Sequence, residues 1–442
     1  MKSFGLVFAG LPLLLAPTAT LAADLGVSAS GPGYTLTASG GFVAFGLPAQ
    51  DTAVVDSGAG SFASTAAAIN ALGFKGSLGG SFDLGVMDGA KLSIGGNVFG
   101  AIASGSSSAV DTFTGPGTVV ISGYSTPAGS IALITGANPQ SAISGTGAAA
   151  ADQTITTSGP STDVIGAVQH AAGSAFSLAI ASTNPSGAAH GAIATSAGGI
   201  FVGTGSLNDL TVATRDTQSL VYTGANISLS ASGELADGAE LQASVGPAFR
   251  RLGQHTTIIT TVNIPSQTGL VMPSYADNRT EDLTSDYFGA LGGLGVSKKV
   301  NDTTTFSIGG EVGIYNRSSS FTGSESYALG GGSGTSGLPL AAQSVAGSAA
   351  PSGSANGMAY SASISGALTL AMTKSLSLSL GGSAEYLSSV PVLSHGVTSL
   401  VAGAGGADAS YAGAAGSAGA LPKMGFTSMV NFGATISLGG HF

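Results

Sequence analysis

The chain has no cysteine, no tryptophan and only 8% charged residues among its 442. The absence of cysteine excludes a disulfide-stabilised scaffold. An ordinary soluble domain carries about a quarter charged residues, and a disordered chain combines high net charge with low hydrophobicity. This chain is 43% hydrophobic and fits neither class. Its net charge of −10 argues against nucleic acid as a partner.

The first residues predict export. Lys2 is followed by an apolar run over 4–15, then by Pro17 and the small-residue stretch "TATLAA". This order is typical of a secretory signal peptide, and we expect it to occupy 1–23 with cleavage near Ala22 or Ala23. The alternative is an N-terminal membrane anchor, but the apolar run is too short to span a bilayer. We expect 24–442 to form a single domain.

After the leader, no run of eighteen apolar residues occurs, and alternation with period two takes its place. Over 69–86, residues such as Phe74 and Phe82 fall on one parity, while Lys75 and Ser77 fall on the other. Alternate side chains of a strand point to opposite faces, so the pattern predicts a strand with one apolar and one polar face. The dipeptide Asp88-Gly89 then predicts a hairpin with 90–103.

Three more hairpins have the same alternation: 219–235 with 239–252, 286–299 with 303–317, and 357–371 with 375–388. Their strands, of about 11 to 16 residues, are long enough for tilted membrane crossings, which need about 9–11 residues. With 33–46 and 424–442, ten segments are visible. Two apolar stretches within 104–218, "SAFSLAIAS" and "GGIFVGTGSL", favour twelve strands, and ten is the alternative.

Long Gly/Ala/Ser/Thr-rich connections separate the hairpins, and we expect loops at 48–68, 104–170, 253–285, 321–356 and 389–423. Short turns therefore alternate with long loops, as in outer-membrane barrels with periplasmic turns and extracellular loops. A soluble sandwich would need a well-charged exterior, which the polar faces here do not supply. We therefore predict an all-β, transmembrane, antiparallel up-and-down β-barrel.

Aromatic residues near the expected strand ends are consistent with an interfacial belt. They are Tyr222, Tyr287, Phe288, Tyr315, Tyr360, Tyr386 and Phe426. Strands favour aromatic residues in any case, so the belt is supporting evidence only. Arg251 has the lipid-facing parity, and we expect it at the outer interface, where a basic side chain reaches water.

The last segment, "GFTSMVNFGATISLGGHF", resembles the closing strand of porin-like Gram-negative outer-membrane β-barrel proteins, which commonly end in a terminal Phe. The matching residues are Phe432, Ile436, Leu438 and Phe442, whereas Gly440 stands where a bulkier apolar residue is usual. The resemblance implies an outer-membrane location, surrounding lipid, and recognition by the barrel assembly machinery. It indicates no subfamily.

Charged residues of the polar parity are expected to face the lumen. They are Lys75, Asp83, Lys91, Glu234, Glu240, Arg250, Glu311, Arg317 and Glu385. Lumenal charges set the selectivity of an aqueous pore, or they pair across the lumen and plug it. The sequence favours the first interpretation, which predicts a passive pore for ions or small polar solutes. The alternative is a structural or surface-interaction barrel with an occluded lumen.

A third alternative, a secreted Gly-rich β-helix or adhesin, predicts a repeat of tens of residues, which the sequence does not contain. No residue pattern indicates a catalytic, cofactor or metal site, so we expect no enzyme activity and no cofactor. A homo-oligomer stays an open alternative.

Overall fold

The computed structural model describes only part of the chain. Its described segments are 33–47, 54–56, 62–64, 70–87, 89–113, 117–122, 130–135, 140–146, 153–156, 164–169, 176–181, 191–196, 199–204, 210–235, 238–263, 274–329, 343–345, 352–394, 400–402, 411–412, 414–417 and 423–442. The expected signal peptide lies outside these residues. In the described part, no helix is long and apolar enough to cross a membrane.

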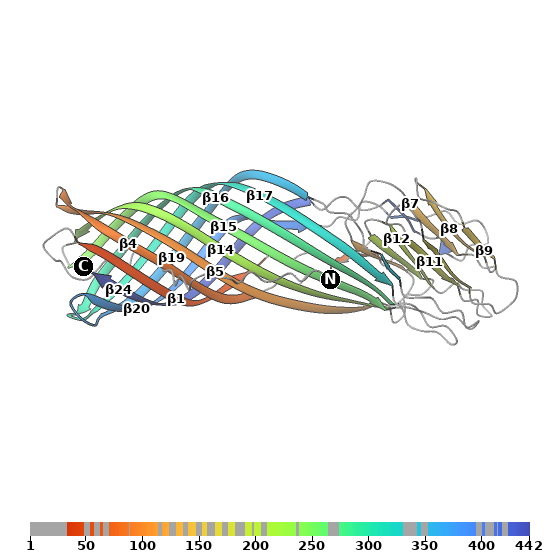
Figure 1. Ribbon diagram of the computed structural model, residues 1–442, viewed down its shortest axis with the longest axis horizontal. Coiled ribbons are helices and arrows are strands. Elements are labelled where there is room, and N and C mark those ends of the chain that lie inside the picture. Colours follow the sequence, from red (N-terminus) through yellow and green to blue (C-terminus); the bar gives the residue numbers. More distant parts are fainter. Residues whose placement is uncertain are drawn as a thin grey trace.

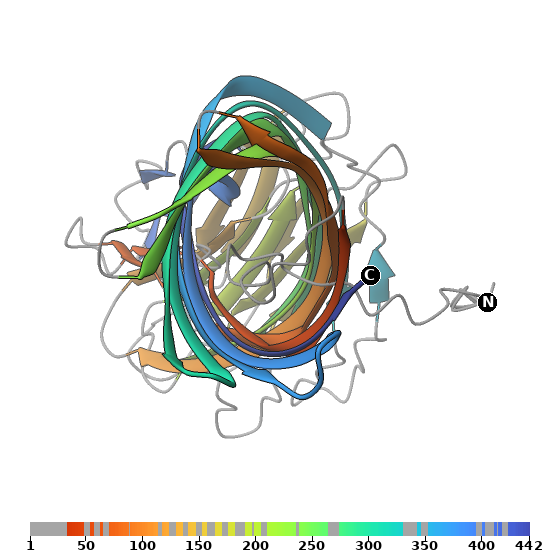
Figure 2. The same cartoon turned by 90° about the vertical axis from the view of Figure 1, so that its left-hand side faces the viewer.

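Ten antiparallel strands close into a ring (Figures 1 and 2). They are β1 (Tyr34–Gly46), β4 (Asn70–Met87), β5 (Ala90–Phe113), β14 (Leu210–Glu234), β15 (Ala239–Asn263), β16 (Ser274–Asn301), β17 (Thr304–Leu329), β19 (Ser352–Ala371), β20 (Leu376–Ser394) and β24 (Lys423–His441). Each strand pairs with the next one along this series, so the topology is up-and-down. The predicted fold class is confirmed, with the lower of the two predicted strand numbers.

The two termini of the barrel close the ring. β24 pairs with β1 from Thr35 opposite His441 to Gly46 opposite Val430. Backbone bonds in both directions between Tyr34 and Phe442, of 3.0 and 3.1 Å, continue the ladder, and the two rings stack at 5.3 Å. The expected pairing of the last strand with 33–46 is therefore confirmed. Closure leaves no strand edge at this level of the wall.

A belt of exposed apolar side chains surrounds the lower part of the barrel, next to the short turns. On β14 and β15 it runs through Ile227 and Val245. Its upper members are Ile102, Val221, Phe249, Phe288, Ile314, Tyr360, Tyr386 and Val430, all of them exposed. Above them the outward positions become polar, for example Ser219 on β14 and Asp286 on β16. We call this boundary the rim, and its sharpness is that expected at the edge of a bilayer.

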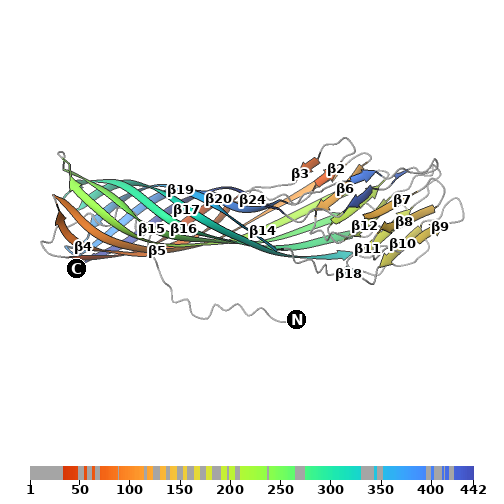
Figure 3. The same ribbon diagram turned by 90° about the horizontal axis from the view of Figure 1, so that it is seen from above.

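Above the rim the strands continue for many residues as a tall extension (Figures 1 and 3). β15 and β16 reach Asn263 and Ser274, so they enter the segment 253–285 that was expected to be a loop. The same holds for β5, β17, β19 and β20, which enter 104–170, 321–356 and 389–423. In this region the outward face is polar and the inward face carries much of the apolar content, so the alternation changes phase at the rim.

The two additional strands expected within 104–218 do not join the ring. β11 (Phe176–Ala181) and β13 (Gly199–Thr204) pair in a separate sheet with β2 (Val54–Asp56), β3 (Phe62–Ser64), β6 (Gly117–Ser122), β10 (Val164–Gln169) and β12 (Gly191–Ser196). A third sheet contains β7 (Ser130–Thr135), β8 (Gln140–Thr146), β9 (Gln153–Thr156), β21 (Leu400–Ala402), β22 (Tyr411–Ala412) and β23 (Ala414–Ser417). A short strand, β18 (Gln343–Val345), pairs with β17. Apolar content alone does not distinguish a strand of the barrel wall from these short strands.

The expected aromatic belt is only partly present. Phe288, Tyr360 and Tyr386 are exposed on the outside. In contrast, Tyr222, Tyr287 and Tyr315 are at most 1% exposed and face the lumen, because their positions have the inward parity. Arg251 lies outside just above the rim, as expected, with its Nε 3.5 Å from Oδ1 of Asp286.

Arginine substitutions on the outer face of β14 test where the bilayer ends. Ile227→Arg places a charge within the apolar belt and should lower the free energy of unfolding by about 2–4 kcal/mol. Ser219→Arg, on the same strand and face but above the rim, should change it by less than about 1 kcal/mol. Urea unfolding in lipid vesicles measures both values. Equal costs at the two positions would contradict the assigned rim.

Candidate functional site: a closed lumen

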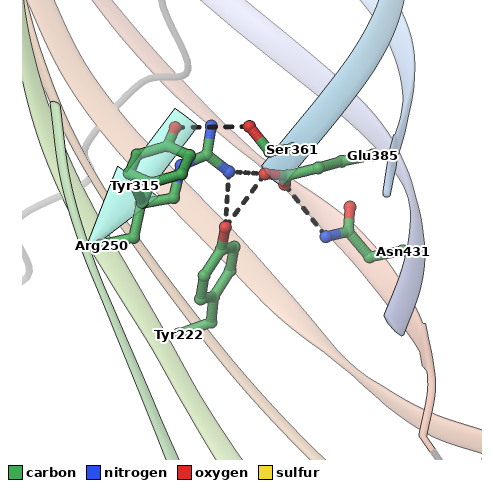
Figure 4. Close-up of polar contacts among 6 residues, drawn as sticks. All are labelled: Tyr222, Arg250, Tyr315, Ser361, Glu385 and Asn431. Atoms are coloured by element: carbon green, nitrogen blue, oxygen red, sulfur yellow. Dashed lines mark hydrogen bonds and ion pairs between the residues drawn. The ribbon is translucent and has the colours of Figure 1, made fainter. Parts of the chain in front are cut away.

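The inward positions of the strands bring polar side chains from distant parts of the sequence together inside the barrel. We call one such group the plug and define it as Tyr222, Arg250, Tyr315, Ser361, Glu385 and Asn431 (Figure 4). These residues lie on six different strands, and each is at most 7% exposed. The plug therefore joins the barrel wall across its lumen.

An ion pair between Arg250 and Glu385 is the centre of the plug. Arg250 is on β15 and Glu385 on β20, and these strands are not neighbours in the ring. The pair therefore crosses the lumen. Both side chains are 8% exposed, so neither charge is shielded by bulk water and each depends on its partner.

Hydrogen bonds complete the surroundings of the carboxylate. The Tyr222 hydroxyl donates to Oε1 of Glu385 at 3.0 Å and accepts from Nη1 of Arg250 at 2.6 Å. Nδ2 of Asn431 donates to the other oxygen, Oε2, at 3.0 Å. Both carboxylate oxygens thus have donors, as a buried charge requires.

Aromatic rings surround the guanidinium of Arg250. Its Cζ lies 5.4 Å from the Tyr315 ring centroid and 6.0 Å from that of Phe99, within the range of cation–π attraction. Lys75 lies over the other side of this group, with Nζ 5.2 Å from the Phe99 centroid. Gly313 leaves room for the phenol, because a Cβ there would lie 2.5 Å from the Tyr315 hydroxyl. The inward glycine is therefore part of the packing of the plug.

The plug lies at the level of the rim. Arg250 follows Phe249, Tyr222 follows Val221, and Tyr315 follows Ile314. Each of these apolar neighbours points outward at the top of the belt. The same is true of Ser361, Glu385 and Asn431, beside Tyr360, Tyr386 and Val430. The cross-lumen network is therefore level with the upper edge of the apolar belt.

An apolar cluster fills the lumen next to the plug and above it. Its inward side chains include Phe45, Leu220, Leu252, Leu387 and Val390, all at most 1% exposed. Such side chains pack in van der Waals contact. Polar and apolar side chains together therefore occupy the lumen at this level.

Below the plug the lumen contains a polar vestibule, a cavity that is open to solvent. Its walls carry Thr37, Asn97, Asn226, Ser244 and Glu311, among other hydroxyl, amide and glycine positions. Glu311 is close enough to Lys75 and Arg250 for electrostatic attraction to both. The vestibule is thus hydrophilic on the side of the short turns and ends at the plug.

The expected lumenal charges fall into two groups. Lys75, Arg250, Glu311, Arg317 and Glu385 lie in the lumen at or near the rim. Asp83 and Glu240 are half-buried, and Glu240 accepts a 2.7 Å bond from the Ser232 hydroxyl near the lower mouth. Lys91 and Glu234 are exposed beside the turns, so they do not contribute to a constriction.

Sequence reasoning does not identify four components of the plug. Tyr222 and Tyr315 have the inward parity, but they are aromatic and near expected strand ends, which assigns them to the interfacial belt. Nothing in the sequence singles out Ser361 among the serines of its face, or indicates that Asn431 contacts Glu385, 46 positions away. A strict reading of parity finds the two tyrosines, whereas the contact of Asn431 depends on register.

A second group of inward polar residues lies above the rim. Asp216 on β14 is 4% exposed. Burial, together with the negative charge of Glu281 on β16, raises the pKa of its carboxyl group to about 6. On the same face, Nε2 of Gln218 donates to Oε1 of Gln254 at 3.1 Å.

Comparisons with known proteins add little. No protein-family model matches the chain. No curated protein matches it either. Solved structures that overlap it include the Pseudomonas putida toluene transporter TodX, 9% identical, with 94% of this chain and 91% of that chain covered and a TM-score of 0.18. A Pseudomonas aeruginosa FadL homologue is 7% identical, with coverages of 92% and 90% and a TM-score of 0.20.

Outer-membrane expressed OmpT of Vibrio cholerae is 10% identical, with coverages of 92% and 98% and a TM-score of 0.15. Overlaps at these scores say nothing about what passes through or binds to this chain. The closed ring, the apolar belt and the polar lumen themselves make the chain an outer-membrane type of β-barrel.

Removing one partner of the central ion pair should destabilise the barrel more than removing both. Arg250→Met or Glu385→Leu alone leaves a buried charge without its counter-ion and should lower the free energy of unfolding by about 3–5 kcal/mol. The double substitution should lower it by less than either single one. Urea unfolding in vesicles, followed by circular dichroism, gives the four values. Lys91→Met at an exposed turn is the control, and additive single costs would contradict the pairing.

Asp216 should make stability depend on pH. The pKa of Asp216 is raised in the folded state. Its contribution to the free energy of unfolding is therefore fully present below the unfolded-state pKa of about 3.8 and is lost as the pH rises through about 6. Asp216→Asn should therefore match the wild type near pH 4 and exceed its free energy of unfolding at pH 8 by up to about 3 kcal/mol. Asp302→Asn, at the exposed turn between β16 and β17, is the matched control. A difference between wild type and Asp216→Asn that is the same at both pH values would contradict this assignment.

Proposed function

We propose that the chain is a structural or surface-interaction barrel of the Gram-negative outer membrane, with an occluded lumen. The observation that carries this proposal is the filled cross-section at the rim, where the Arg250–Glu385 pair and the neighbouring apolar cluster occupy the lumen together. A ring of ten strands is narrow, so a few inward side chains suffice to fill it. We propose no catalytic or cofactor-binding role.

The tall extension supports a role at the surface. β15, β16 and β17 continue far above the apolar belt with polar outward positions, such as Thr257 and Ser318. A barrel that only had to cross the bilayer would need about 9–11 residues per strand. The additional length carries the upper ends of these strands well clear of the membrane, where they can contact partners outside the cell.

The closing strand supports assembly in the outer membrane. Phe442 is 64% exposed at the lower end of the barrel, where its ring stacks on Tyr34. Phe432, Ile436 and Leu438 face outward on the same strand. We propose that this outward apolar row with its terminal Phe is the segment read by the barrel assembly machinery, and that lipid surrounds the finished belt.

The second candidate function is a passive pore for ions or small polar solutes. The vestibule favours it, because its hydroxyl and amide walls suit hydrated solutes. Passage would require the plug side chains and the apolar cluster above them to move aside. The two candidates therefore differ in whether breaking the plug is sufficient to open the lumen.

Conductance in planar bilayers separates the two functions. If the barrel is occluded, the wild type should give no current steps. The double variant Arg250→Ala/Glu385→Ala should also give none, since the apolar cluster still closes the lumen. If the barrel is a pore, the wild type should give current steps, and the double substitution should make the openings more frequent. Heat-modifiable migration in a detergent gel verifies that each variant is a folded barrel. Reproducible wild-type steps would overturn the first proposal.

A further inference from the structure

The upper part of β20 leaves the barrel wall on one side. The ladder between β19 and β20 ends with Ser361 opposite Leu387. The ladder between β20 and β24 continues up to Ser394 opposite Lys423, and β19 stays paired with β17 up to Ser352. Among the described strands, residues 352–360 of β19 therefore have a ladder partner on one side only.

A bulge marks the point where β20 separates. The register between β20 and β24 shifts between Leu387 and Val390. Ser389, within the bulge, has φ of +58°, a left-handed conformation that is unfavourable for residues other than glycine. Two side-chain bonds take the place of ladder bonds here: Tyr360 N donates to the Ser388 hydroxyl at 2.7 Å, and the Ser389 hydroxyl donates to Met358 O at 3.0 Å.

Above the bulge, the strand folds into the lumen. The carbonyl of Ser389 accepts bonds from the Tyr287 hydroxyl and from Nη1 of Arg317, both at 3.3 Å. The carbonyl of Pro391 accepts from Nε2 of Gln254 at 3.2 Å. These donors come from β16, β17 and β15, none of which pairs with β20 in the ring. The backbone of β20 thus contacts parts of the wall beyond its ladder neighbours.

Side chains of the same segment pack on that wall. Leu393 is 2% exposed in a cluster with Leu283, Phe321 and Met424. Cζ of Arg317 lies 3.4 Å from the ring centroid of Phe426, on β24. Phe426 is 38% exposed and packs on Arg317 above the rim, so it lies above the expected aromatic belt. β24 follows β20 inward because the two strands remain paired.

We propose that residues 388–394 of β20 and 423–429 of β24 form a lid that closes the upper barrel and opens about Ser388 and Ser389. In the open state, β20 continues its ladder with β19, which places Leu393 opposite Ala355 in the register of the lower ladder. The unpaired edge of β19 is the acceptor for this movement. Its residues from Ser352 to Gly357 are small or polar and present no obstacle to pairing.

The contacts of the closed state and those available in the open state make this movement feasible. The closed lid is held inside the barrel by three side-chain bonds of 3.2–3.3 Å, by the contact of Arg317 with Phe426, and by two apolar clusters, one around Leu393 and one that includes Val390 and Met429. Opening exchanges them for ladder bonds to β19 and releases the left-handed conformation of Ser389. Bulges and strained residues of this kind occur where a strand must change direction. Opening would expose the Gln218–Gln254 pair to solvent, whereas the plug below stays in place.

Cysteine pairs test the lid cleanly, because the chain has no cysteine of its own. Leu283→Cys with Leu393→Cys reports the closed state, and Ala355→Cys with Leu393→Cys reports the open state. Disulfide formation needs the two Cα atoms within about 7 Å, so the rate of each cross-link reports how often Leu393 lies next to that wall strand. Under mild oxidation in vesicles we expect rapid cross-linking of the closed pair and slower but complete cross-linking of the open pair. Leu393→Cys alone controls for links between molecules.

A matched pair of substitutions at the hinge tests the direction of the effect. Ser389→Gly and Ser389→Ala both lose the bond to Met358, but only glycine adopts positive φ at no steric cost. The open pair should therefore cross-link about fivefold more slowly with Gly than with Ala. Folding of each variant is verified by heat-modifiable migration.

Two results would overturn the lid. If the open pair never cross-links in a folded barrel while the closed pair does, the lid does not open. If the closed pair fails to cross-link in a folded barrel, the lid does not lie inside the lumen. Neither result depends on conductance, so the lid and the proposed function can fail separately.

Discussion

Pairing of every backbone polar group within the bilayer is the constraint on which this structure depends. Hydrocarbon offers no hydrogen bonds, so a β-structure can cross it only as a closed ring. The chain meets this requirement by pairing its last strand, up to His441, with its first, from Thr35. Once ten strands are closed in this way, the width of the lumen follows, and what remains for side chains is to face lipid or fill a narrow interior.

The interior is filled differently on the two sides of the rim. Below it, apolar residues such as Ile227 face lipid, and the lumen is a polar vestibule. Above it, the outer face is polar, as at Ser219, and apolar residues such as Leu220 and Leu252 point inward. The upper barrel therefore has the layout of a water-soluble protein and the lower barrel that of a membrane protein. One continuous set of strands changes from one solvent to the other.

This change of phase explains how much could be predicted from the sequence. The lower strands were found because Ile227 and Leu229 alternate with serines in a single phase, and the closing strand was found for the same reason. Near Leu220 and Val221 the apolar residues move to the other parity, which resembles the end of a strand. The extension was therefore expected to be loop, although it is strand.

The candidate site shows the same limit. Parity placed Arg250 and Glu385 correctly in the lumen, because it depends only on the local pattern. Which lumenal charges meet depends on the order and stagger of the strands around the ring, and these are set by pairings between distant segments. The bulge at Ser389 shifts the alternation by one residue, so that Leu387 and Val390 are both buried, but such a shift within a short apolar run resembles the end of a strand.

The position of the plug follows from these two layouts. At the rim, the inward face changes from polar to apolar, so buried polar groups there have the vestibule on one side and the apolar cluster on the other. A charge placed higher would lose water without gaining more partners, and a charge placed lower would remain solvated and hold nothing together. At the rim, Arg250 and Glu385 are desolvated enough to need each other, and donors from Tyr222 and Asn431 meet them there. Because the pair joins β15 to β20, which are not neighbours in the ring, it constrains the cross-section of a barrel whose ladders alone constrain only its perimeter.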